Sequence, residues 1–160
     1  MKKKNINIII NTCIIISIVL LLAILILFLI NKKEVSNRIV SIDYNKYSEL
    51  INSNEAKIII LSTPTCPHCS NYKKSINYVI DEYKNIEVYD LNISELKYEE
   101  YLEIHDKYNG TKNKYNDSNV PVILTPTTII VKDGEEIYST SGDLHYTGFT
   151  NLLKTYQLIK

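Results

Sequence analysis

Hydrophobic and polar positions divide the chain into an apolar N-terminal segment and a longer mixed region. From Ile6 to Ile30, 25 residues, the polar side chains are Asn7, Asn11, Thr12 and Ser17. A helix of about 20 apolar residues crosses a hydrocarbon core about 30 Å thick. A cleaved signal peptide is the alternative, but its apolar core is shorter and ends in small residues, whereas this segment ends LILFLINKK. We therefore expect an uncleaved transmembrane anchor.

The charges that flank this segment predict its orientation. Lys2, Lys3 and Lys4 precede it, and Lys32, Lys33 and Arg38 follow it together with Glu34. The positive-inside bias favours a cytoplasmic N-terminus, residues 1–5, and an extracytoplasmic C-terminal domain. Residues 31–38 then form a linker, and residues 39–160 form the folded domain at the cell membrane.

Beyond the linker, strand-like and helix-like patterns alternate. Lys57 to Ser62 (KIIILS) is a β-branched run typical of a strand buried on both faces. Tyr72, Ile76, Val79, Ile80 and Tyr83 recur at helical spacing and predict an amphipathic helix that begins at Cys66 or Pro67. The remaining expected elements are strands at Arg38–Ile42 and Ile86–Leu91, helices at Asn45–Ser53, Ser94–Tyr108 and Thr147–Leu158, and a turn-rich loop at Asn109–Asn119.

Near the C-terminus the pattern predicts an antiparallel hairpin. Thr127 to Lys132 and Glu135 to Thr140 flank Asp133-Gly134, a favoured two-residue turn. The order β-α-β-α-β-α-β-β-α combines parallel crossovers with this hairpin. It predicts an α/β fold, a mixed sheet with helices on both faces.

Charge excludes one class of partner. The chain has 18 basic and 18 acidic residues, so its formal net charge is zero. No basic field is available to attract nucleic acid.

The chemistry-bearing motif is Cys66-Pro67-His68-Cys69. Zinc needs about four ligands, and the domain offers only His68, His105 and His145 besides the two cysteines. Haem attachment requires C-x-x-C-H, but Ser70 follows Cys69. A structural disulfide closing so short a loop would constrain the unfolded chain little. The pattern favours a redox couple, with the metal site and the structural disulfide as weaker alternatives.

The position of the pair, after a buried strand and at the start of a helix, suits redox chemistry. The thiolate is the attacking form, and an unperturbed cysteine near pKa 8.5 is about 3% thiolate at pH 7. At the N-cap, the Cys66 sulfur faces unpaired N–H groups and the positive end of the helix dipole. Pro67 fits the first helical position, and His68, when protonated, adds positive charge. Cys69 lies on the same helix face and can resolve a mixed disulfide.

This arrangement resembles the thioredoxin fold over about Arg38 to Lys160. The segment LTPTTIIVKDGEEI, Leu124 to Ile137, is similar to the family's cis-proline region. The resemblance implies that Pro126 is the cis-proline packed against the redox pair, and that the backbone of Thr125 pairs with an extended substrate. Pro121 is an alternative, but it lacks the following Thr and hairpin. The resemblance implies neither a cofactor nor a metal.

Within the family, Cys-Pro-His-Cys resembles the DsbA-type envelope oxidases. One anchor plus a small domain resembles membrane-tethered thioredoxin-like proteins of Gram-positive bacteria, including bacteriocin-transport accessory proteins. The implied function is exchange of disulfides with exported cysteine-containing proteins, as an oxidase, with a membrane redox partner. An extracytoplasmic reductase and a non-catalytic module that binds an exported peptide are the alternatives.

Three features depart from the family pattern. Thr65 stands where thioredoxins commonly carry tryptophan, and Ile58 to Leu61 lacks the buried acid often found on that strand. Proton transfer to or from Cys69 is then expected to use water, His68 or substrate. The stretch from Asp90 to Pro126 is long, and its 109–119 loop reads as a tolerated surface insertion or as a determinant of substrate choice.

Overall fold

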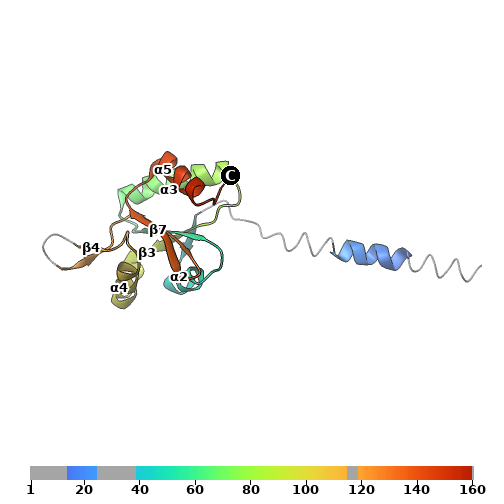
Figure 1. Ribbon diagram of the computed structural model, residues 1–160, viewed down its shortest axis with the longest axis horizontal. Coiled ribbons are helices and arrows are strands. Elements are labelled where there is room, and N and C mark those ends of the chain that lie inside the picture. The colour runs from blue at the N-terminus through green and yellow to red at the C-terminus, as the bar shows by residue number, and fades with distance from the viewer. Residues whose placement is uncertain (1–13, 25–38, 115–118, 160) are drawn as a thin grey trace, which may run out of the picture. The chain divides into compact units, whose positions relative to one another are not determined.

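The computed structural model describes residues 14–24, 39–114 and 119–159 (Figure 1). The chain divides into two compact units, Met1–Glu34 and Val35–Lys160. Residues 14–24 form a helix with exposed side chains. None of the helices within the described ranges combines the length and apolar character of a membrane span. The rest of the predicted anchor, the N-terminus at 1–5 and the linker at 31–38 lie outside these ranges.

The second unit is built on a five-stranded mixed sheet of order β1-β3-β2-β6-β7. β1 and β3 pair in parallel, as do β3 and β2, whereas β6 runs antiparallel to both β2 and β7. The bounds are β1 Val40–Ile42, β2 Lys57–Ser62, β3 Val88–Asn92, β6 Thr127–Lys132 and β7 Glu135–Ser141. The predicted combination of parallel crossovers and a C-terminal hairpin is confirmed.

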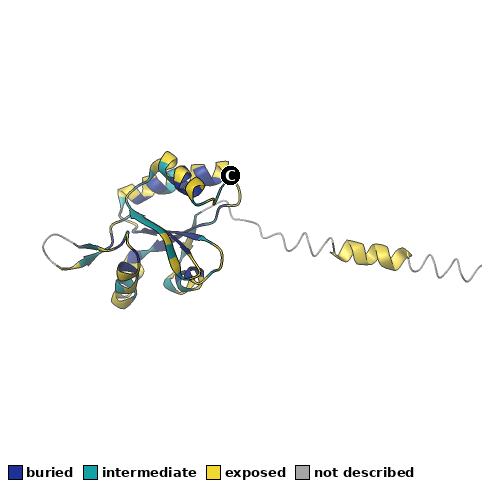
Figure 2. Ribbon diagram, in the orientation of Figure 1, coloured by how far each residue is buried: buried dark blue, intermediate teal, exposed yellow. Residues whose placement is uncertain are grey.

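Helices cover both faces of this sheet, as Figure 1 shows. Helices α3 and α5 pack on one face, and α2 and α4 on the other. Their bounds are α2 Tyr44–Ile51, α3 Pro67–Glu82, α4 Tyr98–Lys107 and α5 His145–Thr155. Each helix has a buried stripe and an exposed side (Figure 2), which is the reason for the 3.6-residue spacing of its apolar positions.

The central strand β2 explains why the sheet forms where it does. All six of its residues are buried. Ile59 and Leu61 enter the core beneath α2 and α4, while Ile58 and Ile60 enter the core beneath α3 and α5. Because both faces of this strand are covered, it requires the continuous apolar run that predicted it.

The hairpin between β6 and β7 turns at Asp133-Gly134. Asp133 has φ 53° and Gly134 has φ 81°. A two-residue turn with both central residues at positive φ matches the twist of the flanking strands, and Gly is the residue that adopts this conformation without strain.

Some element boundaries differ from the sequence-based prediction. The helix expected from Ser94 to Tyr108 is a 3-10 turn, η1 Ile93–Glu95, followed by α4. Leu96 and Lys97 have extended backbones, which interrupts the helix. The predicted loop at Asn109–Asn119 contains β4 Asn113–Lys114, which pairs antiparallel with β5 Pro121–Val122 in a separate two-stranded sheet.

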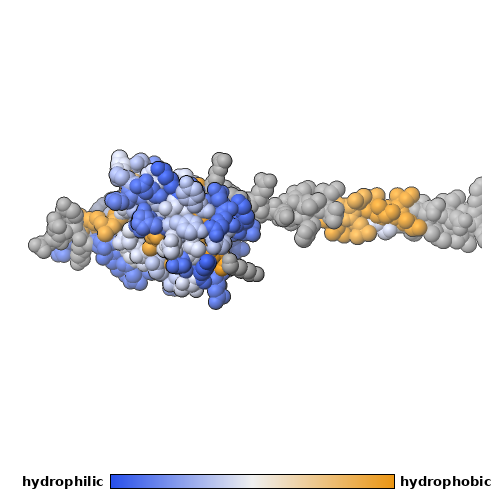
Figure 3. Space-filling model, turned by 90° about the horizontal axis from the view of Figure 1, so that it is seen from above, coloured by the Kyte–Doolittle hydropathy of each residue, from blue (hydrophilic) through white to orange (hydrophobic). Residues whose placement is uncertain are grey.

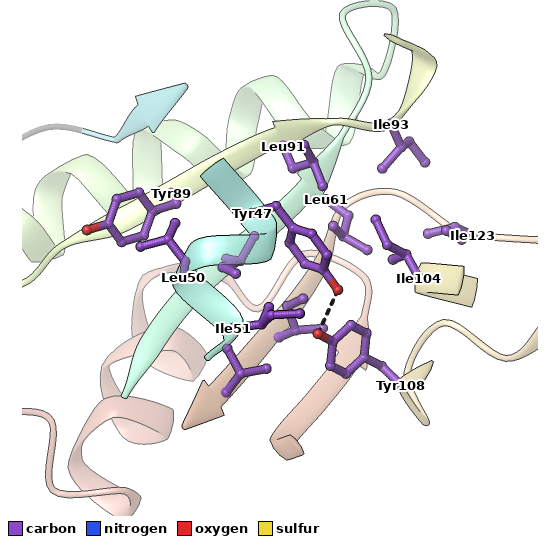
Figure 4. Close-up of a cluster of buried hydrophobic side chains, with 13 residues drawn as sticks. Tyr47, Leu50, Ile51, Leu61, Tyr89, Leu91, Ile93, Ile104, Tyr108 and Ile123 are labelled. Carbon is purple, nitrogen blue, oxygen red and sulfur yellow. Dashed lines mark hydrogen bonds between the residues drawn. The ribbon is translucent and has the colours of Figure 1, made fainter. Parts of the chain in front are cut away.

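The face of the folded unit shown in Figure 3 is mostly hydrophilic. The core beneath α2 and α4 holds two buried tyrosines whose hydroxyl oxygens lie 2.7 Å apart, Tyr47 and Tyr108 (Figure 4). Each hydroxyl satisfies the other, so neither is buried without a partner. Burial raises the pKa of Tyr108 to about 12, and burial also raises the pKa of Tyr47.

Alkaline pH is therefore expected to destabilise the folded unit. In the unfolded chain tyrosine ionises near pKa 10, about two units below Tyr108 in the folded state. The stabilisation is complete below about pH 10 and is lost as the pH rises towards the folded pKa, by up to about 1.4 kcal/mol per pH unit for each tyrosine. Denaturant titrations at several pH values measure this slope. A Tyr47→Phe/Tyr108→Phe variant should show a shallower slope, and Tyr78→Phe, at an exposed position, should not. Equal slopes in all three proteins would contradict the assignment.

Candidate active site

Cys66 caps the N-terminus of α3 through its sulfur. Its backbone is extended, with φ −87° and ψ 108°, and the Cys69 N–H donates to Cys66 Sγ over 3.1 Å. Pro67 occupies the start of the helix, where a missing N–H removes no helical hydrogen bond. The sulfur thus takes the place that a Ser or Asp oxygen takes at most N-caps.

The two cysteines are joined as a disulfide, with Cα atoms 5.3 Å apart. They differ in access, because Cys66 is half-buried whereas Cys69 is only 2% exposed. A sulfur atom on another molecule can reach Cys66 but not Cys69. Pro67 and His68 are exposed in the first turn of α3.

Strand pairing brings Thr125 and Pro126 to the same place. β6 runs antiparallel to β2 with Leu61 opposite Thr127, so the residues before β6 lie beside those after β2. The Thr125 carbonyl oxygen lies 3.4 Å from Cys66 Sγ. The peptide bond between Thr125 and Pro126 is cis, and Pro126 is buried. Pro121, the alternative, follows a trans bond and lies in β5.

The Thr125 N–H can donate a hydrogen bond to another chain at this site. Thr125 is half-buried, and among the described residues its N–H has no hydrogen-bond partner. Its carbonyl points towards Cys66, while the next carbonyl, that of Pro126, accepts from the Gly142 N–H over 2.7 Å. The predicted residues Cys66, Cys69, Thr125 and Pro126 are thus gathered within one site, with His68 at its exposed edge.

Below the redox pair lies a buried acid that sequence reasoning missed. Asp90 is 8% exposed, and its two carboxylate oxygens accept from Ser62 Oγ at 2.7 Å and from Lys73 Nζ at 2.6 Å. Strand β2 lacks an acid, as expected, but Ile60 pairs with Asp90 on the neighbouring strand β3. Lys73 follows Cys69 by one helical turn, so the ion pair extends from β3 to the helix that holds the cysteines. The expectation that water, His68 or substrate moves protons at Cys69 stays a prediction.

A signal for this residue exists in the sequence. In the strand pattern IEVYDL, Val88 and Asp90 share a face and Tyr89 and Leu91 share the other. A carboxylate in the middle of such a run needs a cation, and Lys73 occupies a position on the helix that packs there.

A buried tyrosine, Tyr72, lies three residues after Cys69 on α3. Tyr72 is fully buried, and its hydroxyl oxygen lies 2.8 Å from Thr128 Oγ1 on β6. Burial raises the pKa of Tyr72, so the side chain stays neutral beneath the redox pair. Among the described residues, no group of three or more His, Cys, Asp or Glu side chains could hold a metal ion.

Several solved structures with a similar fold are thioredoxins. Thioredoxin f2 from Chlamydomonas reinhardtii superposes with a TM-score of 0.58 and 10% identity, covering 76% of this chain and 99% of that one. The fold is thioredoxin-like. Fasciola hepatica thioredoxin gives a TM-score of 0.51 at 19% identity, covering 77% of this chain and 99% of that one.

Mitochondrial thioredoxin 3 from Saccharomyces cerevisiae, solved in its oxidized form, is a third structurally similar protein. It has a TM-score of 0.51 and 18% identity, covering 73% of this chain and 94% of that one. No protein-family model matches the chain. The predicted thioredoxin-like mixed sheet with helices on both faces is confirmed, and at these identities the likeness concerns the fold.

The partly buried Lys73–Asp90 ion pair of this thioredoxin-like domain is testable by removing its cation. Lys73→Met leaves the Asp90 carboxylate buried without a counter-charge, so we expect the free energy of unfolding to fall by about 2–3 kcal/mol. Lys46→Met is the matched control, because Lys46 pairs with Glu49 at the surface, where such pairs contribute under about 1 kcal/mol. Urea denaturation measures both. Equal losses in the two variants would show that the Asp90–Lys73 pair contributes no more to the free energy of unfolding than a surface pair.

Proposed function

We propose that this chain is a thiol–disulfide oxidoreductase in which Cys66 exchanges disulfides with cysteine-containing proteins. The observation that carries the proposal is the position of the Cys66 sulfur. It caps α3, it is half-buried, it lies 3.4 Å from the Thr125 carbonyl, and it is joined to a buried second cysteine. The thioredoxin-like fold supports the same chemistry, since it presents such a pair at the end of its central strand.

As an oxidase, the chain would act from the disulfide form. A substrate thiolate attacks Cys66 Sγ, the Cys66–Cys69 bond breaks, and Cys69 leaves as a thiolate. A second substrate thiolate then attacks the substrate sulfur of this mixed disulfide, and Cys66 leaves as a thiolate. The substrate loses two electrons and two protons, which the Cys66–Cys69 pair retains as a dithiol. Reduction of a substrate disulfide is the same sequence in reverse.

Helix α3 favours the oxidase direction. The thiolate that leaves at Cys66 is stabilised by the Cys69 N–H and by the positive end of the helix dipole. Stabilising the reduced form makes the disulfide more oxidising, by about 30 mV for each 1.4 kcal/mol. Continued turnover then requires a redox partner that removes two electrons from the dithiol, whereas a reductase would require one that supplies them.

We propose that the backbone of Thr125 binds the substrate chain. A carbonyl oxygen of an extended peptide can accept from the Thr125 N–H while the peptide's cysteine lies against Cys66. Main-chain pairing of this kind does not depend on the substrate's side chains. A wide range of protein substrates is therefore compatible with the site.

The proposed location is the outer face of a cell membrane. The apolar segment from Ile6 to Ile30 and its three preceding lysines support an anchor with a cytoplasmic N-terminus. Exported proteins would then be the substrates, as for DsbA-type envelope oxidases. The plan of one anchor and one small domain also supports a likeness to Gram-positive accessory proteins, in which a non-catalytic binding role is the alternative.

Trapping with a Cys69→Ser variant tests the proposal. Without the resolving thiol, substrates should remain attached to Cys66 as mixed disulfides, visible as adducts on non-reducing gels that disappear with reductant. Cys66→Ser is the matched control and should form none. A Cys69→Ser chain that gathers no more adducts than Cys66→Ser would favour the binding module over the enzyme.

The residues between the cysteines supply a second test, of the direction of transfer. His68 is exposed in the first turn of α3, where its protonated form would stabilise a thiolate at Cys66. His68→Leu should lower the reduction potential by about 10–20 mV, from a loss of about 0.5–1 kcal/mol. Equilibration with glutathione buffers measures it. Replacing His145, an exposed histidine in α5, is the control and should leave the potential unchanged.

A wild-type potential near that of a reducing cytosol would contradict the oxidase assignment.

A further inference from the structure

The residues that lead into the cis peptide bond belong to no strand. Residues 123–126 connect β5 to β6, and the pairing between β2 and β6 begins only at Thr127. Connecting segments are usually more mobile than the elements they join, because no regular hydrogen bonds fix them. The position of Thr125 beside Cys66 therefore depends on contacts from other parts of the fold.

The first of these contacts comes from α4. The Ile123 N–H donates to the Tyr101 hydroxyl over 2.6 Å. Tyr101 is half-buried and precedes Ile104 and His105, the buried residues of α4, by three and four positions, so it lies on the same helix face. The Ile123 side chain is 5% exposed and packs in the same core as Ile104 (Figure 4). Both the backbone and the side chain of Ile123 are thus fixed to the core beneath α2 and α4.

Two further contacts hold carbonyl groups on either side of Thr125. The Leu124 carbonyl accepts from Thr127 Oγ1 over 2.6 Å, and Thr127 is fully buried. The Pro126 carbonyl accepts from the Gly142 N–H over 2.7 Å. Between these fixed groups, the Thr125 N–H has no partner in the described part of the chain. The segment is therefore held on both sides of the donor that the proposed function assigns to the substrate.

A backbone donor binds an incoming chain best when its position is fixed beforehand. A segment that becomes ordered only when its partner binds loses part of the interaction free energy to conformational entropy. Removing a hydroxyl partner also leaves a backbone group without its hydrogen bond, which favours other arrangements of the segment. The Tyr101 and Thr127 hydroxyls both bond to this segment rather than to either cysteine, so they affect the order of the backbone and not the sulfur.

We propose that Tyr101 and Thr127 are positioning residues for substrate binding. Through their bonds to the backbone before it, they keep the Thr125 N–H in place for an extended polypeptide. They act on the affinity for that polypeptide rather than on the reactivity of Cys66. This inference rests on the proposed function, and it gives α4, which carries neither cysteine, a part in substrate recognition.

Single-turnover exchange separates affinity from reactivity. The reduced full chain is mixed with an excess of one of two disulfides: a disulfide-linked dimer of a linear peptide, or bis(2-hydroxyethyl) disulfide, which has no peptide backbone. In both reactions Cys66 attacks the disulfide and Cys69 then displaces the substrate sulfur from Cys66. The substrate is reduced to two thiols, and the dithiol of the chain is oxidised to the Cys66–Cys69 disulfide. The dependence of the rate on peptide concentration gives a maximal rate and a half-saturating concentration.

In a Tyr101→Phe chain the half-saturating concentration of the peptide should rise about three- to tenfold, the range that loss of about one hydrogen bond gives. The maximal rate, the rate with bis(2-hydroxyethyl) disulfide and the reduction potential should keep their wild-type values. Tyr44→Phe is the matched control, because the Tyr44 hydroxyl also bonds to α4, but at Glu103 rather than at the 123–126 segment. It should match the wild type in every measurement.

Thr127 supplies a second pair of variants. Thr127→Val keeps nearly the same shape but removes the donor to the Leu124 carbonyl, so it should raise the half-saturating peptide concentration in the same way. Thr127→Ser keeps the hydroxyl and should return this concentration towards the wild-type value. The comparison of these two variants decides the inference even where Tyr101→Phe does not fold.

The outcomes separate this inference from the function on which it rests. If the wild-type chain reacts with neither disulfide, the oxidoreductase itself fails. If it reacts with both, and Tyr101→Phe and Thr127→Val show the wild-type half-saturating concentration, the positioning role is overturned and the oxidoreductase stands. Equal losses of rate with the peptide and with bis(2-hydroxyethyl) disulfide would show a general effect on the fold or on Cys66, and would also overturn the positioning role. So would a wild-type chain that shows no saturation with the peptide.

Discussion

Everything proposed for this chain depends on a sulfur atom that caps a helix. Cys66 Sγ accepts from the Cys69 N–H over 3.1 Å, so the atom that reacts is also the atom that closes the first turn of α3. An N-cap acceptor is favoured when it is negative, because the unpaired N–H groups and the helix dipole both stabilise an anion there. The thiolate is therefore the form of Cys66 that best suits the fold. Structure and reactivity are joined in one contact, and a substitution that weakens the start of α3 is expected to affect both.

The sheet supplies what this contact requires. β2 is buried on both faces and ends at the redox pair, while its antiparallel partner β6 returns the chain so that Thr125 meets the same sulfur. Beneath them the Asp90–Lys73 pair joins β3 to α3. A buried ion pair contributes little net stability compared with apolar packing, but it admits few alternative arrangements. At this position it holds the helix in register with the strands, and it keeps a carboxylate and an ammonium group near the helix face that carries Cys69.

Much of this could be predicted from the sequence, because the decisive signals are local. KIIILS predicts a strand buried on both faces, Cys66-Pro67 predicts a helix start, and Asp133-Gly134 predicts a hairpin turn. What could not be predicted depends on contacts between distant segments. The pairing of Ile60 with Asp90 requires the register of two strands. The positions of Asn113 and Ile123 depend on hydrogen bonds to His105 and Tyr101, which lie 8 and 22 residues earlier in the chain. Local sequence patterns do not reveal such contacts.

The most direct test of this account is the ionisation of Cys66 itself. A full chain with Cys13→Ser and Cys69→Ser leaves one thiol, and its thiolate can be followed by ultraviolet absorbance or by its rate of alkylation across a range of pH. We expect its pKa to lie below the value of about 8.5 for free cysteine, because the N-cap position stabilises the anion. A pKa at or above the free value would mean that the start of α3 does not activate this sulfur, and would contradict the proposed function at its source.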